Sequence, residues 1–266
     1  MSFTPTHLKD RTIVEVIGPD AATFLQGLIT NDVTKASGNH AIYAALLTPQ
    51  GKIVYDFLVT AADGGFRLDC AKQHAPDLAA RLRKYKLRAK VTITERSDVA
   101  VIASTTPVDR AFADPRLAAL GFRAFQTAVE ATGSETAYHA HRIALGVPDS
   151  SDLPPETLFP LDCNFEELHG VDFDKGCYVG QELTARMKHR ATARRRILRV
   201  EAASPLPPPG TPLKRGDTEL GEMLGSIGAH GLAIIRLDRL NNAAEADAGG
   251  LTVSISRPPY PLTTNP

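Results

Sequence analysis

Three apolar runs joined by very short loops are the feature that most constrains this fold. YAALLT (43–48) and KIVYDFLVT (52–60) flank Pro49-Gln50-Gly51, and FRLDC (66–70) follows Asp63-Gly64-Gly65. Both loops contain the residues that tight turns require. Loops this short join antiparallel neighbours, because a parallel crossover needs about a dozen residues or more. The sequence therefore favours an α+β protein with antiparallel sheets over a doubly wound parallel sheet.

The remaining elements are expected from hydrophobic periodicity. Alternating apolar residues predict further strands at 12–18, 91–95 and 99–103. Apolar residues spaced three or four apart predict helices at 24–29, from Pro76 onward, and within 134–148. Residues 104–133 are only weakly patterned. After Arg199 a proline-rich segment leads into short strands suited to a small β-barrel, at 224–228, 232–237 and 251–256. We place the domain boundary near residue 195.

Composition excludes several classes of protein. The 266 residues are enough for about two domains, and 43% apolar with 23% charged residues is ordinary globular usage. No run of about 18 uncharged apolar residues occurs, and the N-terminal residues lack the apolar core of a signal peptide. Cys70, Cys163 and Cys177 are odd in number and form no C-x-x-C pair. We expect a cytosolic protein without disulfides and without a membrane partner.

The segment 159–190, FPLDCNFEELHGVDFDKGCYVGQELTARMKHR, has the most distinctive pattern in the chain. Gly176 and Gly180 bracket Cys177, and a helix is expected to begin close to this cysteine. Lys175 and the positive end of that helix would both favour the thiolate form of Cys177. Cys177 is therefore the best candidate nucleophile or ligand, although a lone cysteine is more often a small buried side chain.

KGCYVGQELTARMKHR (175–190) resembles the signature of the YgfZ family, which is K-G-C-aromatic-x-G-Q-E followed by an arginine on the next helix. Further segments match the same family in order and spacing: FLQGLITNDV (24–33), TPQGKIVYDFLV (48–59), RIALGVP (142–148), the stretch from Asn164 to Gly170, and GEMLGSIGAHGLAIIRLD (221–238). The resemblance covers nearly the whole chain.

The resemblance implies a fold related to the T-protein of the glycine cleavage system, a folate-dependent aminomethyltransferase. Residues 1–194 would form two interwoven subdomains and residues 195–266 a β-barrel domain, in a ring around a central channel. It also implies a role in maturation or repair of iron-sulfur enzymes, including radical enzymes of tRNA thiolation. The partners would be assembly proteins and client enzymes, the cofactor tetrahydrofolate or a related reduced folate. The compartment would be the bacterial cytoplasm, or the mitochondrial matrix for a mature organellar form.

The same resemblance assigns site residues. Cys177 would be the functional thiol, and the folate site would comprise Asn31, Tyr55, Asp56, Lys175, Tyr178, Gln181, Glu182 and Arg186. T-proteins carry paired aspartates where this chain has Tyr55-Asp56, and they tend to carry a glutamate where it has Ala144. Adjacent residues of a strand face opposite sides, so only one of Tyr55 and Asp56 can reach a shared cavity, and we prefer Asp56. A glycine-cleavage enzyme is therefore not expected.

Alternative readings remain open. Cys163, His169 and Cys177 could form a partial metal site, but three ligands without a C-x-x-C pair make a poor structural zinc site, so we assign no metal. Residues 81–90 hold six cations and residues 186–199 hold seven, with no acid in either stretch. They form solvated faces or bind an anionic partner: a folate polyglutamate tail, an acidic protein surface or, least expected without interleaved aromatics, RNA.

Three function classes follow from these observations. The first is a folate-binding accessory protein for iron-sulfur assembly. The second is a folate-dependent one-carbon transferase of the glycine cleavage type. The third is a charged scaffold that has lost its ligand.

Overall fold

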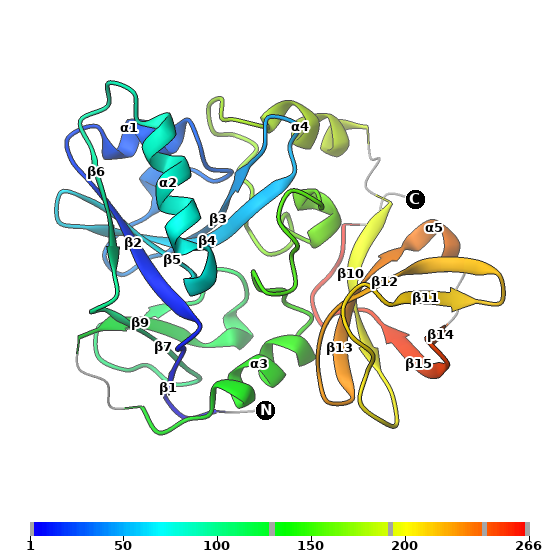
Figure 1. Cartoon of the computed structure of the whole chain (residues 1–266). Coiled ribbons are helices and arrows are strands. Elements are labelled where there is room, and N and C mark those ends of the chain that lie inside the picture. Colours follow the sequence, from blue (N-terminus) through cyan, green and yellow to red (C-terminus); the bar gives the residue numbers. More distant parts are fainter. Residues whose placement is uncertain (1–2, 128–130, 191–193, 241–243, 264–266) are drawn as a thin grey trace.

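A five-stranded antiparallel sheet forms the first layer of the protein. The computed structural model describes residues 3–127, 131–190, 194–240 and 244–263 (Figure 1). In sheet order the strands are β3 (Ile42–Leu47), β4 (Ile53–Ala62), β5 (Gly65–Ala71), β2 (Arg11–Ile17) and β6 (Thr92–Arg96). The predicted meander is confirmed, because β3 pairs with β4 and β4 pairs with β5, both antiparallel.

Two helices complete this layer. Helix α1 (Ala21–Gln26) and helix α2 (Ala75–Tyr85) bury Leu25, Leu78 and Leu82 in one core with Val14 and Phe57 of the sheet. A proline in the first turn of α2 suits a helix start, because the amide hydrogen it lacks would have no partner within the helix. Short 3-10 helices, η1 (Val33–Lys35) and η2 (Lys72–His74), lie before β3 and α2.

A second, smaller sheet is interwoven with the first in the order of its strands along the chain. Its strands, in order, are β1 (Thr6–His7), β7 (Ala100–Ser104), β9 (Phe122–Gln126) and β8 (Phe112–Ala113), with η3 (Ala118–Leu120) between the last two. The chain begins in this sheet at β1, enters the first sheet at β2 and returns at β7. Residues 104–133 appeared unpatterned because β8 has only two residues and β9 only five, with a short 3-10 helix between them, and such short elements leave little periodic signal. Helix α3 (Glu135–Ala144) packs Tyr138 against Phe3 and Val101.

The C-terminal part is a closed six-stranded barrel. Around the barrel the strands are β10 (Arg195–Glu201), β13 (His230–Arg236), β12 (Thr218–Ile227), β11 (Pro212–Arg215), β14 (Glu245–Ala248) and β15 (Leu251–Ser256), with helix α5 (Leu237–Leu240) after β13. The barrel expected from the sequence is confirmed. Strands β10, β11 and β14 were not expected, because their alternation is carried by charged residues. That residues 1–194 and 195–266 are separate domains remains a proposal.

The barrel shares a hydrophobic core with the first layer. Tyr43 and Leu58 of the first sheet lie in one buried cluster with Phe165, Leu224 of β12 and Tyr260. Between the two parts runs a segment that contains η4 (Pro160–Cys163), and helix α4 (Gln181–His189) follows it (Figure 1). None of the helices in the described ranges combines the length and the apolar character that crossing a bilayer requires.

Candidate functional site

Cys177 lies on a loop that leads into α4. Its side chain is exposed, whereas Cys70 and Cys163 are buried, and all three are free thiols. Burial raises the pKa of Cys70 to about 12 and that of Cys163 well above its ordinary value, so neither forms a thiolate readily. A Cβ atom placed on the neighbouring Gly176 would meet no atom within 4 Å. The exposure of Cys177 itself makes its thiol accessible, and the backbone at Gly176 beside it is uncovered as well.

Lys175 anchors the Cys177 loop to residues 26–31. Its Nζ donates to the carbonyl oxygens of Gln26 at 2.9 Å, Ile29 at 2.6 Å and Asn31 at 3.0 Å. The ammonium group also lies 4.9 Å from the centre of the Tyr178 ring. Burial lowers the pKa of Lys175 to about 8. Each ammonium hydrogen has a carbonyl acceptor, so this side chain fixes the loop to residues 26–31, a contact that local sequence could not indicate.

A second anchor joins the loop to the hairpin turn after β3. Gly180 has a φ of 84°, and a Cβ atom there would lie 2.5 Å from the carbonyl oxygen of Thr48. A Cβ atom on Gly51 would lie 3.0 Å from the carbonyl oxygen of Gly180. The two backbones touch at positions where only glycine fits. The Pro49-Gln50-Gly51 turn and the segment after Cys177 are thus parts of one structure.

The other predicted residues of the cysteine motif surround this loop. Tyr178 is buried, and burial raises its pKa to about 12. Its backbone N–H points to Oε1 of Gln181 at 3.4 Å. Glu182 and Arg186 form an ion pair one turn apart on the exposed face of α4. Tyr178, Gln181 and Glu182 therefore lie together after Cys177, where they line one shallow cavity, and Arg186 joins them through its ion pair with Glu182.

Asn31 supports the loop and is itself buried. Its Nδ2 donates to the carbonyl oxygen of Tyr43 at 2.8 Å and to that of His169 at 2.7 Å. Its Oδ1 accepts from the backbone N–H of Asp32. These bonds tie the segment before η1 to β3 and to the approach of the cysteine loop. The structure gives Asn31 a positioning role, and binding of a cofactor by this residue stays a prediction.

Tyr55 and Asp56 face opposite sides of β4, as the strand pattern predicted. The Tyr55 hydroxyl bonds to Asp77 of α2, and its ring stacks on His74 with centroids 4.9 Å apart. On the other side, Asp56 accepts from Oγ of Ser150 at 2.5 Å and from the hydroxyl of Tyr43 at 3.0 Å. Burial, together with the negative charge of Asp149, raises the pKa of Asp56.

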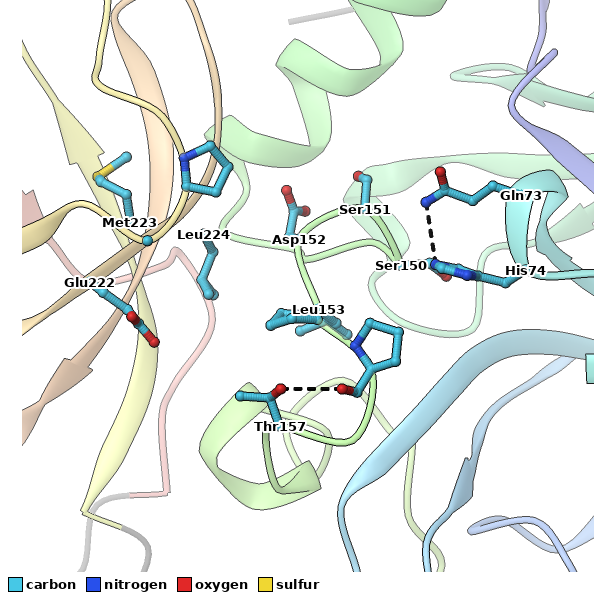
Figure 2. Close-up of a pocket in the computed structure, with 14 residues that line it drawn as sticks. Gln73, His74, Ser150, Ser151, Asp152, Leu153, Thr157, Glu222, Met223 and Leu224 are labelled. Atoms are coloured by element: carbon cyan, nitrogen blue, oxygen red, sulfur yellow. Dashed lines mark hydrogen bonds between the residues drawn. The ribbon is translucent and has the colours of Figure 1, made fainter. Parts of the chain in front are cut away.

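A cavity of about 430 Å³ opens beside Ser150, where the N-terminal layers meet the barrel (Figure 2). Figure 2 shows Gln73 and His74 on one side, Glu222, Met223 and Leu224 of β12 on the other, and the segment around Leu153 between them. Asp56 is not a lining residue, because Ser150 stands in front of it. No residue between 175 and 186 lines the cavity either. The predicted site is thus divided into a thiol region and a cavity backed by Asp56.

Asp149 is a buried residue that the sequence analysis missed. One carboxylate oxygen accepts from Nη1 of Arg11 at 2.8 Å, while Oδ2 has no hydrogen-bond partner within the described residues. Burial alone would raise its pKa, but the nearby guanidinium groups, led by Arg11 and Arg142, hold the pKa of Asp149 well below its usual range. The sequence offered no signal here beyond a Pro-, Ser- and Asp-rich loop at 149–158.

These residues fit the folate that the family resemblance implies. A pterin ring presents amino and ring N–H donors, and the unpartnered oxygen of Asp149 is a matching acceptor, although it is itself buried and a neighbouring side chain would have to move to admit the donor. Asp149 lines a cavity of about 400 Å³ that shares Gln73 and Ser151 with the cavity of Figure 2. Asp152 is less suited, because its Oδ2 is 2.5 Å from Nη1 of Arg142.

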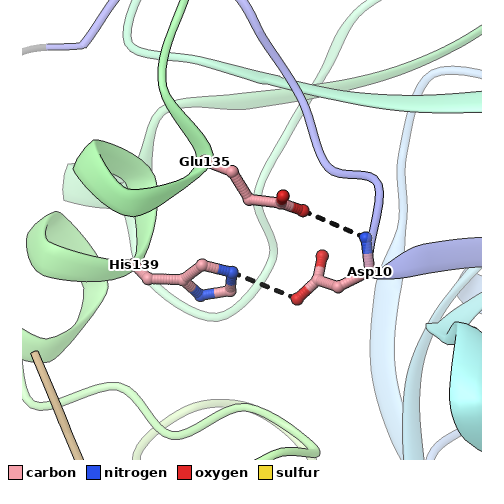
Figure 3. A group of neighbouring side chains, drawn as sticks. All are labelled: Asp10, Glu135 and His139. Atoms are coloured by element: carbon pink, nitrogen blue, oxygen red, sulfur yellow. Dashed lines mark hydrogen bonds and ion pairs between the residues drawn. The ribbon is translucent and has the colours of Figure 1, made fainter.

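Asp10, Glu135 and His139 form a group that resembles a metal site (Figure 3). However, Nε of Arg142 donates to Nδ1 of His139 at 2.9 Å, so the ring proton lies on Nε2. Nε2 is 3.1 Å from Oδ2 of Asp10, and Glu135 accepts from the backbone N–H of Asp10 at 3.0 Å. No ring nitrogen is left for an ion, so the group is a hydrogen-bonded link between α3 and the start of β2.

Comparison with known proteins places this arrangement in a family. The model of the GCVT N-terminal domain matches residues 8–114, and that of the CAF17 C-terminal β-barrel domain matches residues 194–261. The iron-sulfur cluster assembly factor IBA57, mitochondrial, of Homo sapiens is 34% identical over 277 residues, which cover 88% of this chain and 78% of the human protein. The chain belongs to the IBA57 family.

Other members of the IBA57 family give the same result. The homologue of Neurospora crassa is 34% identical over 73% of this chain, and the chain spans about half of that protein (52%). The Mus musculus protein is 33% identical over 79% of the chain and 69% of its own length. All three are named as mitochondrial, which agrees with the second compartment expected from the sequence. The resemblance to YgfZ is thereby confirmed at the level of related iron-sulfur assembly factors.

The fold class is confirmed by a solved structure. Aminomethyltransferase T of the glycine cleavage system from Bartonella henselae superposes with a TM-score of 0.75 and 16% identity, over 99% of this chain and 87% of that one. At this identity the likeness concerns the fold alone. The T-protein-like arrangement of antiparallel sheets, few helices and a C-terminal barrel is therefore established.

Proposed function

We propose that this IBA57-family chain is a folate-binding accessory protein for the maturation or repair of iron-sulfur enzymes, with Cys177 as its functional thiol. The observation that carries the proposal is the Cys177 loop, in a family whose named members are iron-sulfur cluster assembly factors. The thiol is exposed, while Lys175 and Gly180 fix the backbone on either side of it. A thiol held in this way can meet a partner without a large loss of loop entropy.

The proposed folate would occupy the cavities beside Ser150 and Asp149. Asp149 would accept from the amino groups of the pterin, and Asp56 would act behind Ser150, because both of its oxygens are already bonded. The reduced folate would supply a one-carbon carrier. Its proposed partners are assembly proteins and client enzymes, with tRNA-modifying radical enzymes among the clients, in the mitochondrial matrix or an equivalent bacterial compartment.

An aminomethyl transfer reaction of the glycine cleavage type is less well supported. The single carboxylate of Tyr55-Asp56 is sealed by Tyr43 and Ser150, and burial raises its pKa. A general base or an orienting carboxylate needs direct hydrogen-bond contact with the pterin.

Complementation tests the proposal. Cells that lack the gene would receive wild-type protein, Cys177→Ala or the buried control Cys70→Ala, and the activities of several iron-sulfur enzymes would be measured. We expect Cys177→Ala alone to lose rescue while staying folded. Full rescue by Cys177→Ala would exclude the thiol. Calorimetry with tetrahydrofolate tests the cofactor separately: Asp149→Asn should weaken binding, Cys177→Ala should not, and absence of binding to wild type would exclude the folate.

A further inference from the structure

The turn at the end of α2 exposes large apolar side chains to water, which is energetically unfavourable. Among the described residues, the large apolar side chains that are strongly exposed are Leu87, at 90%, and Tyr85, at 39%. Leu87 follows the end of α2 and has a φ of 43°, a conformation that residues other than glycine rarely adopt. Both its backbone strain and its hydration oppose folding. A binding partner that covers the turn would explain why it is kept.

The same turn concentrates positive charge. Five cations lie within eight residues, and all are exposed except the half-buried Lys86: Arg83, Lys84, Lys86, Arg88 and Lys90. Across the described ranges no ion pair involves any of them, although Arg83 donates to the carbonyl oxygen of Ile93. Asp77 and Glu95 are the nearest acids in the sequence, and in space Asp20 accepts from the backbone N–H of Lys90 at 2.7 Å. The turn is thus a basic surface with an apolar tip.

This basic surface adjoins the thiol region. Tyr85 lines a shallow cavity of about 690 Å³ together with Pro49 and residues of the segment that follows Cys177, from Tyr178 to Ala185. The C-terminal end of α2 and helix α4 both lie at the upper side of Figure 1. We call the turn 83–90 and this cavity the docking face. Cys177 does not line this cavity, but it directly precedes the lining residue Tyr178, so one partner could cover the docking face and reach the thiol at the same time.

We infer that the docking face binds an acidic protein surface, which presents its reacting group to Cys177; this rests on the proposed function. The positive charge of residues 83–90 is complementary to an anionic surface. The docking face combines a projecting leucine with a concave region that also contains Glu182. A folded protein can follow such relief, whereas a planar anionic lipid surface would meet only the projecting turn; Glu182 itself is already paired with Arg186.

Charge reversal tests the inference in the full-length protein. Arg88→Glu with Lys90→Glu changes the docking face, and Lys9→Glu with Arg257→Glu makes the same net change at exposed positions elsewhere. In cells that lack the gene, the docking variant should reduce iron-sulfur enzyme activity at least about tenfold, and the control should match wild type. Leu87→Ser should also reduce rescue, although it relieves an exposed apolar side chain. In purified proteins the alkylation rate of Cys177 should be equal in all variants.

The outcomes separate this inference from the proposed function. Loss of rescue by Cys177→Ala combined with full rescue by the docking variant would overturn the docking face and leave the thiol in place. Rescue by Cys177→Ala would remove the proposed function, and the inference with it. Equal loss in the control variant would mean that net charge matters and the docking face does not. Leu87-dependent sedimentation of purified protein with phosphatidylserine vesicles would assign the turn to a membrane and refute the protein partner.

Discussion

Replacing Lys175 by methionine tests whether this side chain anchors the loop or activates the thiol. Methionine keeps most of the length and removes the three donors to the carbonyl oxygens of Gln26, Ile29 and Asn31. At a net value of about 1 kcal/mol for each bond, the free energy of unfolding should fall by about 3 kcal/mol. The matched control is Lys35→Met, because its ion pair with Asp172 leaves the lysine side chain largely exposed, and its loss should cost less than about 1 kcal/mol.

Urea titration at pH 7 and iodoacetamide labelling would be measured on the same samples. We expect Lys175→Met to lower the urea midpoint while the pH profile of Cys177 labelling keeps its shape. The reasoning is wrong if stability changes by less than about 1 kcal/mol, the lower limit for unpartnered buried carbonyls. In that case a shift of the labelling profile to higher pH would make Lys175 a thiolate-stabilising cation instead.

Three further outcomes are expected. Burial lowers the pKa of Lys175 from 10.5 to about 8, so the folded chain binds this proton more weakly than the unfolded chain. As the pH rises from 8 to 10.5, wild type should therefore gain stability relative to Lys175→Met, as measured by urea titration. Gly180→Ala should cost more than about 2 kcal/mol because of its positive φ and the Thr48 carbonyl, with the open Gly176→Ala as near-neutral control in thermal melts. Ser150→Ala removes a donor to a buried carboxylate and should cost about 1–3 kcal/mol by the same melts.

Local sequence was sufficient for elements whose signal is local. The meander of β3, β4 and β5 followed from its turn residues, and the exposure of Cys177 agreed with its position between two glycines. Residues whose role depends on distant contacts could not be placed. Lys175 bonds to carbonyls about 145 residues earlier in the chain, and Asn31 bonds to His169. The sequence around each residue does not indicate its distant partner.

The cavity residues escaped prediction for a related reason. Asp149 and Ser150 belong to an irregular segment without periodicity. Their role becomes apparent only in the folded chain, where Arg11, Tyr43 and Asp56 lie around them. The family resemblance named Asp56 as a site residue, and binding by this residue stays a prediction. It did not reveal that Ser150 covers it, because that contact joins two segments of unrelated pattern.

The core shared by the first layer and the barrel has a consequence for biosynthesis. Tyr43 packs in the same buried cluster as Tyr260, and Asn164 bridges to the Tyr260 hydroxyl at 3.1 Å. A ribosome delivers the N-terminal strands long before it reaches Tyr260, so the nascent chain carries an unfinished apolar surface throughout the synthesis of the barrel. Truncations just before Tyr260 should therefore produce aggregating chains, not a shorter folded protein, and the growing polypeptide should depend on chaperones until the segment after β15 that contains Tyr260 has docked.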